Sequence, residues 1–276
     1  MSTQPYATMN DGQAIPRIGL GVWRTPNDVA AQVVETALQA GYRHVDTAAA
    51  YENEDGVGRA IRGSGLPRDE IFLTTKVWND DQGYERTLRA MDASLERLGT
   101  DYVDLYLIHW PSAFRGQYVE TWKALIRLRE EGKARSIGVS NFEGDYIEDI
   151  VAATGVTPAL NQIQLHPRFQ QRAMRAKHDR LGIVTQSWSP LGQGQLLADP
   201  AIGAIAARHD KSPAQIIIRW HLDMGFVVIP KSVTPSRIVE NFDVFDFTLS
   251  DEDKTAIAGL DAADGRIGSD PVTAQF

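Results

Sequence analysis

Eight short apolar runs alternate with amphipathic stretches along this 276-residue chain, and that alternation is the strongest constraint on its fold. Short apolar runs indicate buried strands, whereas the stretches between them repeat their apolar residues with the period of a helix. Eight strand–helix units in succession predict an α/β fold whose parallel strands close into a (β/α)₈ TIM barrel. The strands are expected at Ile18–Gly21, His44–Thr47, Ile71–Val77, Val103–His109, Ser136–Ser140, Ala159–Gln162, Ile183–Trp188 and Phe226–Ile229.

The amphipathic stretches are the expected helices, and two of them have readable starts. Ser212-Pro213 and Thr234-Pro235 each place a capping residue before a proline that suits the first helical turn. The helices are expected at Asp28–Ala40, Gly83–Leu98, Val119–Glu131, Arg172–Leu181, Pro213–Leu222 and Pro235–Phe242.

The two ends of the chain lie outside this alternating pattern. Near the start, Asn10-Asp11-Gly12 is a hairpin turn signal between two short apolar segments, so we expect an N-terminal β-hairpin that caps the barrel bottom. No linker or shift in composition divides the chain, and residues 1–276 are expected to form a single domain. The tail, residues 261–276, is rich in glycine, aspartate and alanine and is expected to be loosely held.

A doubly wound open sheet is the structural alternative to a barrel. That fold normally carries a G-x-G-x-x-G turn after its first strand. Here Gly19-Leu20-Gly21 is followed by Arg24 where the third glycine belongs, and Gly192-Gln193-Gly194 is followed by Leu197. Neither a phosphate-binding P-loop nor an H-E-x-x-H zinc motif occurs. The barrel is therefore the favoured fold.

Composition excludes several classes of function. The chain has no cysteine, which rules out disulfides, thiolate catalysis and metal sites that need cysteine ligands. It shows neither a signal peptide nor an apolar run of the roughly 20 residues that a membrane span needs, so we expect a cytoplasmic protein. The net charge of −8 disfavours nucleic-acid and membrane partners. No acidic cluster suggests a metal site, and nothing requires more than a monomer.

Titratable side chains gather at the ends of three neighbouring predicted strands. Asp46 ends the second strand, Lys76 the third and His109 the fourth, and Tyr51 follows Asp46 by five residues. Because the active sites of such barrels lie at the carboxyl ends of the strands, we expect these four side chains to meet. Each residue alone has an ordinary structural explanation. Four together at adjacent strand ends predict a catalytic site.

The chemistry of this group follows from its charges. Asp46 would keep Lys76 protonated, and a charged lysine beside a phenol lowers the pKa of that phenol. Tyr51 is therefore expected to act as a general acid near neutral pH. The ring of His109 would orient a carbonyl substrate and stabilise negative charge developing on its oxygen.

The segments that contain these residues resemble the signatures of the aldo-keto reductases. Gly41–Tyr51, Thr74–Asn79, Leu105–Pro111, Ser136–Phe142 and Ile229–Asn241 carry the resemblance, which extends from the hairpin to about residue 260. It implies a catalytic tetrad of Asp46, Tyr51, Lys76 and His109. The segments Trp188–Gly194 and Asn241–Leu249 most resemble the bacterial 2,5-diketo-D-gluconate reductases, whose substrates are carbonyl compounds.

The same resemblance implies NADPH as the cofactor. Ser140, Asn141 and Gln162 would bind the nicotinamide carboxamide, and the nicotinamide ring would stack on Trp188. Further cofactor contacts are expected from Gly21, Val22, Trp23, Ser189, Leu191, Gln193, Ser232 and Val233.

A local basic cluster supports the phosphorylated form of that cofactor. Lys231 and Arg237 flank hydroxyl side chains after the last strand, near the usual phosphate site of such barrels. Two cations suit the 2′-phosphate of NADP, and the resemblance implies that Glu240 and Asn241 hold the adenine.

Aromatic residues after three strands define the expected substrate pocket. Trp23, Trp78 and Trp110 would line it together with Tyr51 and His109. Apolar walls exclude water from a hydride-transfer site, but they do not identify one substrate.

Two other readings of the chain remain open. Barrels with a strand-end lysine include Schiff-base lyases, although such a lysine must lose the proton that Asp46 would retain. A non-catalytic NADPH-binding regulatory protein on the same scaffold is the second alternative.

Overall fold

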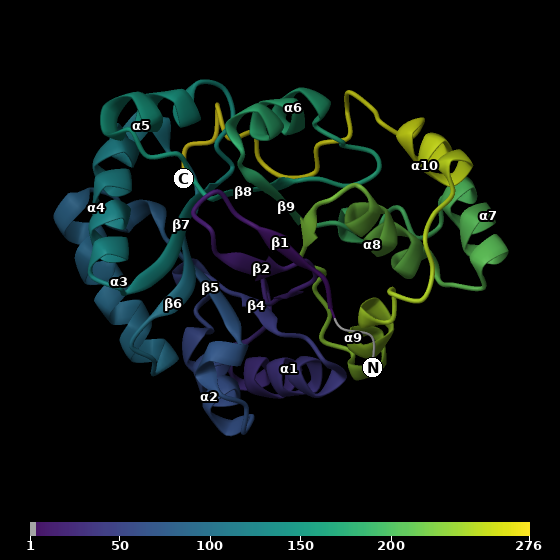
Figure 1. The fold of residues 1–276 in the computed structure, drawn as a ribbon, viewed down its shortest axis with the longest axis horizontal. Helices are drawn as coiled ribbons and strands as arrows, with labels where there is room; N and C mark the ends of the chain where they lie inside the picture. The colour runs from purple at the N-terminus through teal and green to yellow at the C-terminus, as the bar shows by residue number, and fades with distance from the viewer. Residues whose placement is uncertain (1–3) are drawn as a thin grey trace.

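The computed structural model describes residues 4–276, in which eight parallel strands are surrounded by helices (Figure 1). The parallel strands are β3 (Leu20–Gly21), β4 (His44–Asp46), β5 (Phe72–Val77), β6 (Val103–Ile108), β7 (Ala134–Ser140), β8 (Leu160–Gln164), β9 (Val184–Trp188) and β10 (Val227–Val228). The helices are α1 (Asn27–Ala40), α2 (Glu54–Gly63), α3 (Tyr84–Leu98), α4 (Tyr118–Glu130), α5 (Tyr146–Thr154), α6 (Arg172–Leu181), α7 (Pro200–His209), α8 (Pro213–Asp223), α9 (Pro235–Phe242) and α10 (Asp251–Ala258).

The sheet closes on itself. Neighbouring strands follow chain order from β3 to β10, and every pairing is parallel. The backbone N–H of Gly19 donates to the carbonyl of Val228 at 2.8 Å, and the N–H of Val228 donates to Arg17 at 2.8 Å. These bonds join the first strand to the last. The expected (β/α)₈ barrel is confirmed.

Several helices differ from the sequence-based expectation. The helices α6 and α9 have the expected bounds, and α1, α3, α4 and α8 differ by a residue at one or both ends. The structure adds α2, α5, α7 and α10, which the apolar pattern did not predict. Glycine explains the omission of α2, since three of its ten residues are glycine, the poorest helix former after proline.

The glycines of α2 allow close packing beside the active-site loop. A methyl group on Gly56 would lie 2.4 Å from the carbonyl oxygen of Asn27, and one on Gly58 would lie 2.2 Å from that of Leu98. Both distances are far shorter than a carbon–oxygen contact allows. Bare backbone therefore lets α2 touch α1 and α3, which fixes the loop that precedes it.

An N-terminal hairpin covers the end of the barrel away from the active site. Its strands β1 (Tyr6–Thr8) and β2 (Ala14–Pro16) pair antiparallel, and Figure 1 shows them in front of the parallel strands. Met9 and Ile15 are buried against residues near the strand starts, including Phe72 and Leu160. The expected cap of the barrel bottom is confirmed.

The C-terminal segment is held more firmly than the sequence suggested. Residues 261–276 form no helix or strand, but Arg266 pairs with Glu143 at 2.9 Å. The side-chain oxygen of Gln164 accepts a hydrogen bond from the N–H of Gly268 at 2.8 Å. These long-range polar contacts involve a segment that has no periodic pattern, so the sequence did not predict them. Among residues 4–276, no helix is long and apolar enough to cross a membrane.

Candidate active site

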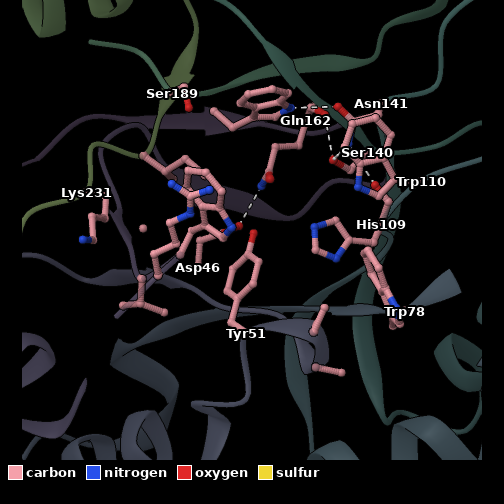
Figure 2. Close-up of a pocket in the computed structure, with 18 of the residues that line it drawn as sticks. Asp46, Tyr51, Trp78, His109, Trp110, Ser140, Asn141, Gln162, Ser189 and Lys231 are labelled. Atoms are coloured by element: carbon pink, nitrogen blue, oxygen red, sulfur yellow. Dashed lines mark hydrogen bonds between the residues drawn. The ribbon is translucent and has the colours of Figure 1, made fainter. Parts of the chain in front are cut away.

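The four residues proposed from the sequence meet at the carboxyl end of the barrel. Asp46 ends β4, Lys76 is the last residue but one of β5, and His109 directly follows β6. Tyr51 ends a short 3₁₀ helix, η1 (Ala49–Tyr51), in the loop after β4. Figure 2 shows the Tyr51 hydroxyl pointing toward Asp46, with the His109 ring beside it.

A buried ion pair lies beneath Tyr51. The Lys76 ammonium donates to the Asp46 carboxylate at 2.5 Å and to the carbonyl of Thr47 at 2.8 Å, and its side chain is fully buried. Burial by itself would lower the pKa of Lys76, but the Asp46 carboxylate and the Tyr51 phenol outweigh it, and the pKa rises. Lys76 is therefore a permanent cation at neutral pH.

Tyr51 lies close to this cation. The Lys76 nitrogen is 5.1 Å from the centroid of the Tyr51 ring. Burial raises the pKa of the Tyr51 phenol, and the charge of Lys76 lowers it only in part. The expectation of a pKa below the ordinary value is wrong for the protein without ligand, because removal of the phenol from water outweighs the nearby charge. Tyr51 is thus protonated at neutral pH.

His109 is neutral in this environment. Burial lowers the pKa of His109 well below its ordinary value, and the positive charge of Lys76 lowers it further. Its ring centroid lies 5.5 Å from that of Tyr51 and 5.2 Å from that of Trp78, both edge to face. Its Nδ1 atom has no hydrogen-bond partner among residues 4–276. One ring nitrogen is therefore a donor and the other an acceptor.

A cavity of about 1120 Å³ opens over these residues. It is lined by three of the four, Asp46, Tyr51 and His109, while Lys76 lies beneath Asp46. Other residues expected from the sequence also line it: Gly21, Val22, Trp23, Trp78, Trp110, Ser140, Asn141, Gln162, Trp188, Ser189, Gln193 and Lys231.

Hydrogen bonds fix the polar side of the cavity. The Trp188 indole N–H donates to the Asn141 side-chain oxygen at 2.8 Å, and the Asn141 amide donates to the Ser140 hydroxyl at 3.1 Å. The Gln162 amide nitrogen donates to the second Asp46 oxygen at 2.7 Å. This network holds a flat aromatic ring and three polar groups around one space (Figure 2).

Comparison with known proteins agrees with this arrangement. The family model "Aldo/keto reductase family" matches residues 17–262. An aldo-keto reductase of Mycolicibacterium smegmatis is 57% identical over 99% of this chain and 98% of its own length. The methylglyoxal reductase DkgA of Escherichia coli K12 is 48% identical over 98% of both chains. A crystal structure of a Gox0644 variant in complex with NADPH superposes with a TM-score of 0.96 at 54% identity, covering 100% of both chains.

This chain belongs to the aldo/keto reductase family. The sequence-based resemblance to this family is thereby confirmed.

Six residues expected to bind a cofactor do not line the cavity of this aldo-keto reductase. Lys231 lines the cavity, and the residues after it lead into α9 without lining the cavity. Glu240 accepts a hydrogen bond from the Ser212 hydroxyl instead, and Asn241 is buried. The six residues outside the cavity are Leu191, Ser232, Val233, Arg237, Glu240 and Asn241.

Sequence reasoning missed several residues that line the cavity. Arg24 follows Trp23 directly, and its guanidinium lies 4.2 Å from the centroid of the Trp23 ring. The buried carboxylate of Glu54 on α2 pairs with the exposed side chain of Arg97 on α3 at 2.7 Å. The sequence could have indicated Arg24, because it is a charged residue directly beside Trp23, which was predicted to line the pocket. No local pattern pointed to Glu54 or Arg97.

The tail contributes to the aromatic wall. The Phe276 ring stacks near Trp78, with centroids 6.1 Å apart and an angle of 8° between planes, and meets Trp110 edge to face at 5.0 Å. The Asn79 amide donates to the Phe276 carbonyl at 2.9 Å. The substrate side of the site is therefore more enclosed than a short free tail would make it.

No cluster of three or more His, Asp or Glu side chains placed to hold a metal ion is found within residues 4–276.

Proposed function

We propose that this aldo-keto reductase uses NADPH to reduce aldehyde and ketone carbonyls to alcohols, with Tyr51 as the proton donor. One observation carries the proposal: a buried Lys76–Asp46 pair lies directly beneath a protonated tyrosine at the base of a large cavity.

The residues present fit a nicotinamide cofactor. Trp188 offers an aromatic face that its bond to Asn141 holds in place, and Ser140 and Gln162 supply polar groups beside it. Lys231 lines the same cavity and suits a phosphate group. When bound, NADPH supplies the hydride that the carbonyl carbon accepts. The six residues outside the cavity, which include Arg237, would contact the distant adenosine part.

The protein's own groups handle the carbonyl oxygen. The neutral His109 ring donates a hydrogen bond that orients this oxygen toward the Tyr51 hydroxyl. Negative charge that develops on the oxygen is stabilised by the Lys76 ammonium and removed when the Tyr51 proton is transferred. Lys76 also lowers the cost of the phenolate left on Tyr51, because its positive charge lowers the pKa of that phenol against the larger effect of burial.

The walls favour small carbonyl compounds. Trp23, Trp78 and Trp110 surround the reacting groups with aromatic surface that excludes water. We propose aldehydes, α-dicarbonyls and keto-sugars such as 2,5-diketo-D-gluconate as the substrate class. The name of the related methylglyoxal reductase DkgA supports an α-dicarbonyl.

A substrate panel tests the function directly. We expect the purified protein to oxidise NADPH in the presence of phenylglyoxal, methylglyoxal or 2,5-diketo-D-gluconate, with a lower kcat/KM for NADH than for NADPH. Absorbance at the nicotinamide band measures the rate. Tight binding of NADPH without oxidation by any of these compounds would favour the non-catalytic alternative.

The Schiff-base alternative requires a neutral lysine. The raised pKa of Lys76, caused by the Asp46 carboxylate and Tyr51 against the effect of burial, keeps this amine protonated. Borohydride trapping with a carbonyl substrate should therefore leave Lys76 unlabelled.

Gly268 provides a second test, directed at Trp188. A methyl group on Gly268 would lie 2.5 Å from the edge of the Trp188 ring and 3.1 Å from the Gln164 oxygen. Gly268→Ala is expected to displace the ring or the tail at a cost of roughly 1–3 kcal/mol and to weaken NADPH binding about 5-fold or more. Tryptophan fluorescence titration measures the Kd. Gly203→Ala is the matched control, because nothing lies within 4 Å of its added methyl group.

A further inference from the structure

A second cavity, of about 310 Å³, lies beside the first and is lined by arginine. Arg86, Arg89 and Arg97 all contribute to it, and all three are carried by α3. These three arginines are exposed, and they gather around one cavity although the net charge of the chain is −8. These arginines have no role in the proposed proton transfer.

The sequence of α3 explains how this cavity forms. Residues three, four, seven and eleven positions apart lie on one face of a helix, which places Arg86, Arg89, Ala90, Ala93 and Arg97 together. The opposite, buried face of α3 packs on the barrel. Because alanine is short, Ala90 and Ala93 leave room between the arginine side chains.

The charges in this cavity do not cancel. Arg97 is paired with the buried carboxylate of Glu54. Within residues 4–276, no ion pair joins Arg86 or Arg89 to a carboxylate, and the only hydrogen bond of the Arg86 side chain is to the backbone carbonyl of Gln82. Asp81 also lines the cavity and opposes an anion, but a net positive charge remains.

The arginine-lined cavity adjoins the catalytic cavity. Ala49, Asp81 and Arg97 line both. Ala49 is the first residue of η1, the 3₁₀ helix that ends at Tyr51. A ligand that reached both cavities, with its carbonyl at Tyr51, would have to pass Ala49 before it met Arg86 and Arg89.

We propose that this cavity binds a carboxylate or phosphate group at the far end of the substrate. The inference rests on the proposed carbonyl reduction and narrows its substrate class to carbonyl compounds with a terminal anionic group. Arginine suits this task because its planar guanidinium binds carboxylate and phosphate oxygens in pairs. Since the anionic group is remote from the reacting atoms, its binding is expected to act on KM more than on kcat.

A series of aldehydes that differ in length and charge tests the proposal. Succinic, glutaric and adipic semialdehydes are compared with butanal, pentanal and hexanal at low ionic strength, because salt screens exposed charges. We expect kcat/KM for the anionic compound to exceed that of its neutral partner by ~10-fold at the length that spans the two cavities. In the double variant Arg86→Ala/Arg89→Ala the ratio of kcat/KM for the anionic compound to that for the neutral one should fall toward one. The fall should come from a higher KM for the anionic compound, while the kinetics with the neutral aldehydes stay unchanged.

Arg180→Ala is the matched control, since this exposed arginine on α6 lines neither cavity. The proposal is overturned if no length shows an anionic preference, if the double variant retains it, or if Arg180→Ala loses it equally. A replacement by lysine, Arg89→Lys, should restore part of the preference.

Failure of the proposed function has a different signature, namely no reduction of any aldehyde, neutral or anionic. In that case calorimetric titration with adipic semialdehyde still tests the cavity. Binding that is equal in the wild type and the double variant, or absent from both, overturns the inference.

Discussion

Tyr51→Phe is expected to lower kcat for carbonyl reduction by about 10²–10⁴-fold, because the ring remains but the proton donor is lost. The phenylalanine ring fills the same space above Lys76, so NADPH should bind with an almost unchanged Kd. Single-turnover measurement of NADPH oxidation, beside a fluorescence titration of NADPH, separates the two effects. This is the largest change in activity that we predict for one atom.

Tyr118→Phe is the matched control. It also removes one hydroxyl, but that group donates to Asp149 at 2.5 Å, and Tyr118 does not line the catalytic cavity. The control should reduce substrates at the wild-type rate. If Tyr51→Phe turned over as fast as Tyr118→Phe, the assignment of the proton donor would have to be abandoned.

Mild acid is expected to unfold this protein well above the pH at which carboxylates are protonated. Burial lowers the pKa of His44 and His178 to about 4. It has the same effect on His166, and it lowers the pKa of His221 to about 3. Three of the six histidines, one of them His109, have an Nδ1 atom with no hydrogen-bond partner among residues 4–276. A proton added to such an atom would therefore have no acceptor for a hydrogen bond.

The direction of this pH effect on the free energy of unfolding follows from the number of protons that the folded and unfolded states bind. Below pH ~6.5 the histidines of the unfolded chain take up protons, while those of the folded chain stay neutral until about pH 4. The free energy of unfolding is therefore unaffected above pH 7 and falls as the pH drops through this window. Within this window each such histidine lowers the free energy of unfolding by ~1.4 kcal/mol per pH unit. Against a total stability of roughly 5–15 kcal/mol, four of them place the unfolding midpoint near pH ~5.

Urea denaturation at several pH values between 7.5 and 4.5 measures this slope. In His178→Gln the slope should decrease by ~1.4 kcal/mol per pH unit, although stability at neutral pH also falls because hydrogen bonds to Thr185 and Asn161 are altered. Carboxylates titrate mainly below this range. A free energy of unfolding that stays constant from pH 7 to pH 5 would contradict the prediction.

The barrel was predictable from the sequence because its strands are short apolar runs. The reacting residues were predictable because they lie at or just after the ends of those runs. Lys76 and His109 each close an apolar run, and parallel strands deliver such residues to one edge. Asp46 and Tyr51 were found with them, since a fixed short loop links the two. Three of the helices that were missed lacked the signal on which the prediction depended: α2 contains three glycines, and α7 and α10 separate their apolar and polar residues only weakly.

The remaining features depend on contacts that no local pattern contains. The hydrogen bond between Asn79 and Phe276 joins residues 197 positions apart. The pKa of Tyr51 was misjudged because the sequence shows a neighbouring charge but not the extent of burial, which is the larger effect here. The arginine-lined cavity likewise required the three-dimensional placement of α3 beside η1, although the spacing of its arginines was visible.

Lys76 and Asp46 are enclosed by the strands, whereas Trp78, Trp110 and Phe276 belong to loops and to the tail. Mutations at these three aromatic positions can reshape the space for a carbonyl compound while the acid–base apparatus stays intact. Natural divergence and laboratory selection should therefore exchange substrates readily in this protein and change the type of reaction rarely. A combinatorial library aimed at new substrates is best restricted to those positions.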